Sequence, residues 1–309
     1  MNRKIALVCG VLFGLSVGGV AVGAASKAKT AKKAKAAGKK KPAARRAGAK
    51  AAVAKRAAAI ATKAPVARKP AKSKDFKPRS KAERIVEKMV KAMGGRSNLL
   101  KVHTIQASGT TSLNTPLGAR RGKLVTYSRK PNYQRVDMDI AGQQITQSFH
   151  PGGGWLRQGS AVLRMPQSML SVAQAESVRS DLELRYFKDG IKVELVGERK
   201  VGKEPCYVVR FTDHQKRSTT YAVSRKTWFP LERSYKGPSP LGGGTVTFMT
   251  RQSDFRWVAF PNASFKIRVP FKIVNLINNR SLGSIQLKKV KLNPPNIASS
   301  FFLPPNPTE

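Results

Sequence analysis

The chain has 309 residues and carries 59 Lys and Arg against 16 Asp and Glu, a formal net charge of +43. The length suffices for one sizeable hydrophobic core, and this excess of positive charge points to a polyanion or an anionic surface as a partner. The two cysteines, Cys9 and Cys206, exclude a disulfide-rich framework and lack the spacing of a zinc site.

Residues 1–25 have the pattern of a cleavable export signal. Two basic residues precede an almost wholly apolar stretch at 5–22, and Gly23-Ala24-Ala25 offers the small residues of a cleavage site. The stretch is short and interrupted by glycines, which makes it a poor permanent membrane span. Lipidation at Cys9 is the alternative, although Val8 stands where a small residue is needed. We expect an exported, periplasmic protein cleaved near Ala24-Ala25.

Residues 26–79 are dominated by two kinds of side chain. They hold 20 Lys and Arg, 19 Ala, one acidic residue and one aromatic residue. Such a segment has too little apolar bulk to offset the entropy of ordering the chain, and its like charges repel one another. We expect a disordered, extended, polybasic arm, followed by one folded domain at 80–309 that keeps 37 basic and 15 acidic residues.

The folded domain opens with a clear helix signal. Ser80-Lys81-Ala82-Glu83 is a capping-box pattern, and the apolar residues of 83–93 fall on one helical stripe. Gly94-Gly95 predicts the end of this helix, because glycine readily takes the backbone conformation that follows a helix.

From 102 onward the hydrophobic period changes to two, and turn residues recur at short intervals. This pattern predicts an antiparallel meander of strands. Residues 167–187 interrupt it with helix-forming residues and no period of two, so we expect one or two helices there. Pro270, in the strand at 265–273, predicts an edge strand or a bulge. A change of phase at Lys288-Lys289 predicts a bulge that curves the sheet.

Together these elements predict an α+β fold. A single antiparallel sheet of about 10–11 strands must curl, and its apolar concave face needs a cover. The helices at 83–93 and 167–187 are the candidates for that cover. We therefore expect an unclosed half-barrel wrapped around helices.

No catalytic constellation is evident in the sequence. His103, His150 and His214 are scattered and have no second ligand at metal spacing. Asp137 and Asp139 alternate on one strand face, where a solvated charge ladder with a neighbouring arginine is favoured over a carboxylate pair. We therefore predict a non-enzymatic protein with no metal and no cofactor, and we interpret Cys206, which lies in an apolar run, as a buried structural residue.

Apolar side chains on the strands and helices are the remaining feature. They either fill an ordinary core or enclose a cleft for acyl chains, for which flexible methionines are well suited. The candidates for lining such a cleft are Met89, Val136, Met138, Trp155, Met165, Met169, Tyr207, Val209, Phe211, Phe248, Phe265, Ile267, Val269 and Phe271.

The order of these features over about 80–305 resembles the LolA-like outer-membrane lipoprotein-sorting family and related envelope lipid carriers. The segments that carry the resemblance are the helix end Met93-Gly94-Gly95, "LLKVHTIQASG" at 99–109, "RKPNYQR" at 129–135, Gly153-Gly154-Trp155, 206–211, 220–223, 229–232 and "KLNPPNIASSFFLPP" at 291–305. The resemblance implies an unclosed barrel capped by helices that carries acyl chains of lipoproteins or lipids across the periplasm. Envelope lipoprotein-transport machinery would then be a partner. The basic arm departs from the family pattern.

Two functions follow as hypotheses. The first is a carrier of lipoprotein acyl chains or lipids whose basic arm tethers it to an anionic envelope surface. The second is an envelope polyanion-binding protein, for lipopolysaccharide, an acidic glycan or nucleic acid, whose folded domain is only an anchor. Nucleic acid is a poor partner for an exported chain, although it would be the default for a cytoplasmic one.

Overall fold

A computed structural model describes residues 78–115, 118–261 and 264–305. These ranges cover nearly all of the predicted folded domain. The predicted signal peptide and nearly all of the predicted arm lie outside the described residues, so the boundaries at 25 and 79 remain predictions.

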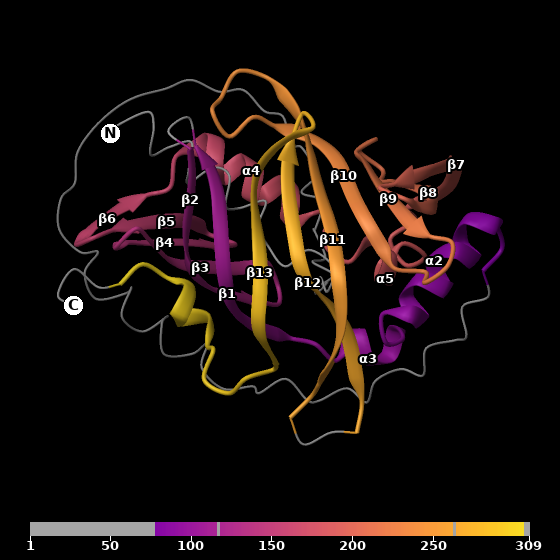
Figure 1. Ribbon diagram of the computed structural model, residues 1–309, viewed down its shortest axis with the longest axis horizontal. Helices are drawn as coiled ribbons and strands as arrows, with labels where there is room; N and C mark the ends of the chain where they lie inside the picture. Colours follow the sequence, from indigo (N-terminus) through magenta and orange to yellow (C-terminus); the bar gives the residue numbers. More distant parts are fainter. Residues whose placement is uncertain (1–77, 116–117, 262–263, 306–309) are drawn as a thin grey trace, which may run out of the picture. The chain divides into compact units, whose positions relative to one another are not determined.

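The folded part is built on one antiparallel sheet of thirteen strands (Figure 1). The strands are β1 (Thr104–Thr115), β2 (Gly118–Arg129), β3 (Tyr133–Ile140), β4 (Gln143–His150), β5 (Gly153–Gln158), β6 (Ala161–Arg164), β7 (Lys192–Val201), β8 (Glu204–Thr212), β9 (Ser218–Ser224), β10 (Pro230–Pro238), β11 (Thr245–Ala259), β12 (Lys266–Ile277) and β13 (Arg280–Leu292). Their order is β6-β5-β4-β3-β2-β1-β13-β12-β11-β10-β9-β8-β7. Strands β6 and β7 stand at the two edges and do not pair with each other, so the sheet is not closed.

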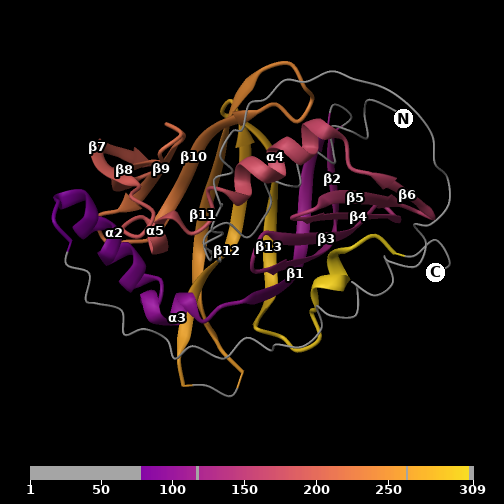
Figure 2. The same cartoon turned by 180° about the vertical axis from the view of Figure 1, so that it is seen from behind.

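The helices lie mainly against one face of this sheet. Figure 2 shows α4 running across the central strands from the side of β2 toward β10. The helices are α2 (Lys81–Ala92), α3 (Arg96–Leu100), α4 (Gln167–Ser177), α5 (Leu182–Arg185) and the 3-10 turn η2 (Ser299–Phe302). Within the described part of the chain, none of them is long and apolar enough to cross a membrane.

Local sequence explains where α2 begins and ends. The Ser80 hydroxyl accepts a hydrogen bond from the Glu83 amide, and the Glu83 carboxylate accepts one from the Ser80 amide, which completes the predicted capping box. Gly94 follows the helix with a φ of 122°, a conformation that favours glycine. The apolar stripe of α2, including Val86 and Met89, is buried as its spacing predicts.

Strand register assigns the side chains to two faces. One lateral row runs through Val209, Tyr221, Arg233, Thr250 and Asn275 on strands β8 to β12. Ion pairs and hydrogen bonds tie members of this row to α4 and α5, so this is the concave face that the helices cover. The opposite face is convex.

Glycines permit the tight curl of the sheet between β13 and β3. A Cβ atom at Gly109 of β1 would lie 2.2 Å from the Gln286 carbonyl oxygen, and one at Gly122 of β2 would lie 2.1 Å from the Asp139 carbonyl oxygen. Neighbouring strands therefore approach each other more closely than any side chain at these positions allows. Strands β3 to β6 consequently run across the direction of β1 and β13 (Figure 1).

The predicted fold class is confirmed, with three differences or refinements. The sheet has two or three strands more than expected, because the short strands β4 to β6 follow one another with little sequence between them. The predicted bulge is present in β13. Lys289 pairs with Ser108 of β1 and Leu287 pairs with Gly109, while Lys288 between them has no partner on that strand. The interpretation of Pro270 was wrong.

Pro270 lies on the central strand β12 and has a regular partner, Phe255 of β11. The ladder between β12 and β13 begins only at Lys272. Proline is therefore accommodated where β12 has no hydrogen-bonded neighbour on that side. A strand in the middle of a sheet can have a locally free edge, which the sequence pattern does not reveal.

Candidate functional site

The helix-covered concave face holds most of the residues predicted to line a cleft. At the end near α2, Val209 and Phe211 are fully buried, and the Phe211 ring packs edge-on against the rings of Tyr186 and Tyr221, with centroid distances of 6.1 and 5.3 Å. Tyr207 is half-buried and stacks on Trp228 at 5.9 Å. This end of the interior is an aromatic cluster closed by α2, to which Met89 belongs.

The central and far parts of the concave face are also apolar. Ile267, Val269 and Phe271 follow one another on the concave side of β12, and all three are buried. Val136 and Met138 of β3 pair with Thr126 and Leu124 of β2 and continue this face around the curl. Met165, Met169 and Phe248 are buried between the sheet and α4.

Two predicted residues lie elsewhere. Trp155 pairs with Ser148, whose own partner is Arg135, and this row belongs to the convex face. The Trp155 indole Nε1 donates a hydrogen bond of 2.9 Å to the Phe302 carbonyl, so the C-terminal turn η2 covers it. Phe265 precedes β12 and packs on Phe260 with a centroid distance of 4.2 Å.

The contact between α4 and the sheet is partly ionic. Glu176 of α4 forms an ion pair with Arg233 of β10, and the two side chains are only 5% and 8% exposed. Arg233 also donates to the Arg179 carbonyl at 3.3 Å. A buried charge is costly when it has no partner, so this ion pair holds the end of α4 on the concave face.

Further carboxyl groups are buried beside this ion pair. The Glu183 carboxylate accepts a hydrogen bond from the Tyr221 hydroxyl at 3.2 Å, and neither carboxyl oxygen of Asp181 has a hydrogen-bond partner among the described residues. Burial raises the pKa of Asp181 well above its usual value, and the neighbouring charge of Glu183 acts in the same direction. Burial also raises the pKa of Glu183. Asp181 is therefore stabilised in its protonated form.

This buried polar cluster was not anticipated from the sequence. Strand alternation could have revealed Arg233, because it lies two residues before Tyr235 on β10 and therefore points to the same face. The carboxylates of Glu176, Asp181 and Glu183 lie in a helical region without a strong apolar period, which left their orientation undefined.

Among the described residues, one small cavity lies between α4 and the sheet. A cavity of about 10 Å³, the room for one water molecule, is lined by Glu176, Tyr235, Phe248, Met249, Thr250, Asn275, Leu276 and Leu282. Pockets that hold small-molecule ligands usually measure about 300–1,000 Å³. This cavity is therefore much too small for an acyl chain.

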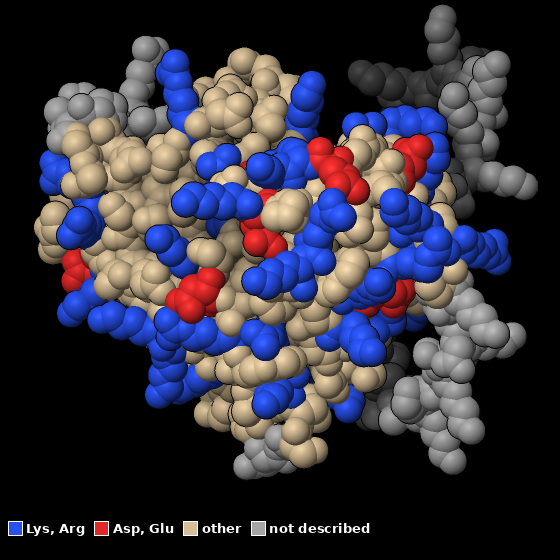
Figure 3. Space-filling view, turned by 45° about the vertical axis from the view of Figure 1, so that its right-hand side comes forward, with Lys and Arg blue, Asp and Glu red and all other residues tan. Residues whose placement is uncertain are grey.

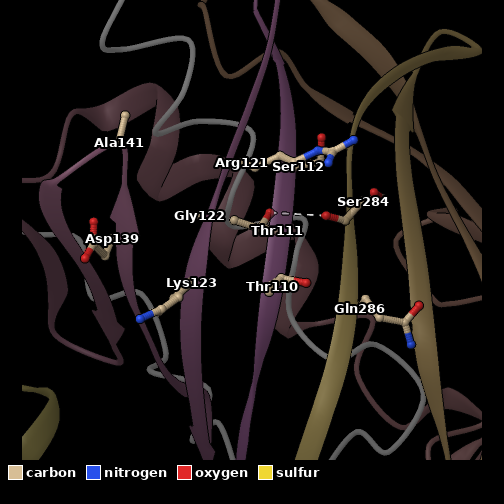
Figure 4. Close-up of a pocket in the computed structure, with 10 residues that line it drawn as sticks. All are labelled: Thr110, Thr111, Ser112, Arg121, Gly122, Lys123, Asp139, Ala141, Ser284 and Gln286. Carbon is tan, nitrogen blue, oxygen red and sulfur yellow. Dashed lines mark hydrogen bonds between the residues drawn. The ribbon is translucent and has the colours of Figure 1, made fainter.

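Two larger depressions are open to the surface. One, of about 520 Å³, lies where the end of α4 meets β10 and the start of β11. The other, of about 720 Å³, lies on the convex face over β3, β2, β1 and β13 (Figure 4). There the Arg121 side chain points across β1 toward Ser284, and Lys123 and Asp139 stand on the opposite side. This second depression is polar and is separated from the concave interior by the sheet.

The described residues offer little catalytic chemistry. No group of three or more His, Cys, Asp and Glu side chains in this part of the chain is placed to hold a metal ion. Asp137 accepts hydrogen bonds from Arg135 at 3.0 Å and Thr146 at 2.8 Å, as expected for a charge ladder. Cys206 is buried, as predicted, and burial raises the pKa of its thiol.

No protein-family model matches the chain, and no curated protein matches it in sequence. Solved structures similar to it include a putative outer membrane lipoprotein-sorting protein domain from Vibrio parahaemolyticus, with 11% identity and a TM-score of 0.44, covering 72% of this chain and 96% of that one. A DUF1329 family protein from Desulfovibrio piger has 15% identity and a TM-score of 0.44, covering 74% and 98%. A LolA superfamily protein from Nitrosomonas europaea has 13% identity and a TM-score of 0.43, covering 73% and 99%. These likenesses are distant and transfer no functional residue to this chain.

Proposed function

We propose that this protein is a non-enzymatic periplasmic carrier that binds acyl chains of lipoproteins or lipids against the concave face of its sheet. The observation that carries this proposal is the apolar concave face itself, which belongs to an unclosed sheet and is covered by short helices rather than by a second sheet. Ile267, Val269 and Phe271 are buried on this face. The edge strands β6 and β7 do not pair, so the sheet itself does not enclose these side chains.

A ligand that enters between α4 and the sheet would have to displace the helical cover, because the cavity there has room for about one water molecule. Helix α4 buries only Met169, Val172, Ala173 and the carboxylate-bearing Glu176, and α5 has four residues. Each methylene group moved from water into an apolar site gains about 0.8 kcal/mol, so ten of them gain about 8 kcal/mol. This gain is similar in size to what α4 loses when it is displaced, about 1.5–3 kcal/mol for each of Met169 and Val172 and about 3–5 kcal/mol for the ion pair of Glu176.

The polybasic segment at 26–79 has a separate role in the proposal. An anionic membrane attracts basic residues near its surface with about 1 kcal/mol each, and salt screens this attraction. The arm would hold the carrier near an anionic envelope surface while the folded domain exchanges its ligand. Deletion of the arm should weaken binding to anionic vesicles at low salt and leave acyl binding unchanged.

Native mass spectrometry of the protein purified from its own envelope tests the carrier function. We expect adducts whose masses and fragments identify a lipid or an acylated peptide. Protein that carries no such adduct, and that binds no acylated probe in solution, would contradict the proposal.

A second function is supported by the surface charge. Figure 3 shows many Lys and Arg side chains and few Asp and Glu side chains across one face. A protein of this kind could bind an envelope polyanion such as lipopolysaccharide or an acidic glycan and use its folded domain only as an anchor. Salt-sensitive binding of such a polymer by a protein that binds no acyl chain would favour this alternative.

A further inference from the structure

A groove lies at the seam between the end of α4 and the sheet, at one rim of the concave face. Its volume is about 520 Å³, within the usual range for ligand pockets. The residues that line it are Gln174, Ala175, Val178, Arg179, Arg217, Lys236, Gly237, Pro238, Gly244 and Thr245. They come from α4, from β10 and from the connections before β9 and β11.

The charge of this groove is one-sided. Three of its lining residues are cationic and none is acidic. Lys236 contributes its backbone carbonyl, because its side chain alternates with Tyr235 and Gly237 and points to the opposite face of β10. Arg217 is paired with Asp213 at 2.6 Å, and Arg179 has no carboxylate partner in the described part of the chain. The groove therefore keeps a net positive charge that would attract an anionic group.

Arg179 is the buried member of this set, with 6% of its surface exposed. Its guanidinium donates to the Ala175 carbonyl at 2.5 Å and to the Lys236 carbonyl at 3.1 Å, while its Nε has no hydrogen-bond partner among the described residues. Neither of the two hydrogen bonds neutralises the charge of Arg179, because both acceptors are backbone carbonyls. A buried guanidinium without a carboxylate partner is a group that an anionic ligand would stabilise.

The floor of the groove leads toward the interior. Gly237 has no side chain, and a Cβ atom there would stand only 3.1 Å from the Tyr235 ring and 3.2 Å from the Phe248 ring. These two rings stack on each other at 5.1 Å, and the Arg179 guanidinium lies 4.6 Å from the Tyr235 ring centroid. The same two rings also line the small interior cavity beside Glu176. They are thus the partition between the open groove and the apolar interior.

We propose that this groove binds the anionic, phosphate-type headgroup of an acylated amphiphile whose chain passes the Tyr235 and Phe248 rings into the concave interior. This inference rests on the proposed carrier function and adds to it a ligand class and an entry point. Arg179 and Arg217 contact the headgroup, and the rings of Tyr235 and Phe248 move aside for the chain. A free phosphate ion offers the same chemistry as the headgroup, so the two sources must be separated by experiment.

The test compares probes that share one acyl chain and differ in headgroup. Lysophosphatidylglycerol is anionic, lysophosphatidylcholine is zwitterionic and a monoacylglycerol is neutral; inorganic phosphate is the fourth probe. The full chain is used below the micelle concentration of each probe, with Arg217→Gln as the test variant. Arg225→Gln is the matched control, because Arg225 also forms an ion pair, with Glu198, away from the groove, and its replacement changes the net charge equally.

Arg217→Gln is expected to weaken lysophosphatidylglycerol binding by about tenfold, since the headgroup loses one attraction and Asp213 is left without its partner. Binding of the monoacylglycerol should change less than twofold, and Arg225→Gln should match the wild type for all four probes. Equal losses in Arg217→Gln and Arg225→Gln would overturn the assignment, because the effect would then come from overall charge.

The remaining outcomes separate this inference from the carrier function. If phosphate binds and depends on Arg217 while the three acylated probes bind equally in both variants, the groove is an anion site without a lipid role, and the inference is overturned. If no acylated probe binds at all, the carrier function fails and the inference fails with it. If all acylated probes bind but none depends on Arg217, the carrier function stands and only the groove assignment is lost.

Discussion

Replacement of Arg233 by methionine tests whether a buried ion pair holds α4 on the sheet. The Arg233 and Glu176 side chains are 8% and 5% exposed, so the Glu176 carboxylate would be left buried and unpaired. Breaking a buried pair from one side usually costs about 3–5 kcal/mol. We expect a loss in this range at pH 8 for Arg233→Met.

The cost should depend on pH in a defined direction. Burial raises the pKa values of Asp181 and Glu183, and the charge of Arg233 lowers them and thereby opposes that effect. In Arg233→Met this charge is missing, so the folded-state pKa values of Asp181 and Glu183 lie further above their unfolded values. The folded state of the variant therefore loses stability as the pH rises from the unfolded to the folded pKa values. The difference between variant and wild type should therefore be larger at pH 8 than at pH 5.

Urea unfolding followed by circular dichroism at both pH values measures this effect. The double variant Glu176→Gln with Arg233→Met should lose less than the sum of the two single variants, because neither charge is then left alone. Arg225→Met is the matched control, since its ion pair with Glu198 is about half exposed and should contribute no more than about 1 kcal/mol. A loss below about 1 kcal/mol for Arg233→Met at pH 8 would refute the reasoning.

Three further changes probe the same fold. Asp181→Asn should raise stability at pH 7 but hardly at pH 4, because the raised pKa of this buried carboxyl destabilises the folded state only above its unfolded pKa, and urea midpoints at the two pH values test this. Gly122→Ala should cost about 1–3 kcal/mol in thermal unfolding, since its Cβ would stand 2.1 Å from the Asp139 carbonyl oxygen. Ser80→Ala should cost about 1 kcal/mol by removing the hydroxyl that caps the Glu83 amide; an unchanged midpoint for either variant would contradict its expectation.

Local pattern was sufficient for the elements whose signals lie within a few residues of each other. The capping box at Ser80 and Glu83 predicted the start of α2, and Gly94-Gly95 predicted its end. The bulge at Lys288 followed from a change of phase within one strand. In each case the physical cause, a helix cap or an alternation of burial, acts over a few residues.

Pairing between distant strands decided the faces of particular side chains. Trp155 reads as apolar and was expected in the interior with Val136, but the register of β3, β4 and β5 places these two on opposite faces. The C-terminal turn then covers Trp155 through the Phe302 carbonyl, 147 residues away in the sequence. A single residue of register moves a side chain to the other face, and no local pattern fixes that register across three strands.

The sequence by itself therefore determined the kind of fold: one amphipathic helix, a long antiparallel meander and a helical interruption that must form a curled, covered sheet. Only the tertiary structure decided that Glu176 pairs with Arg233, 57 residues away, and that the Arg179 guanidinium donates to the Lys236 carbonyl at the rim. The hydrophobic period of a segment predicts which of its side chains are buried, because it depends only on residues that are close in the sequence. Which charges meet inside the sheet depends on how far the sheet curls, and the curl is set by close strand contacts at glycines such as Gly109 and Gly122.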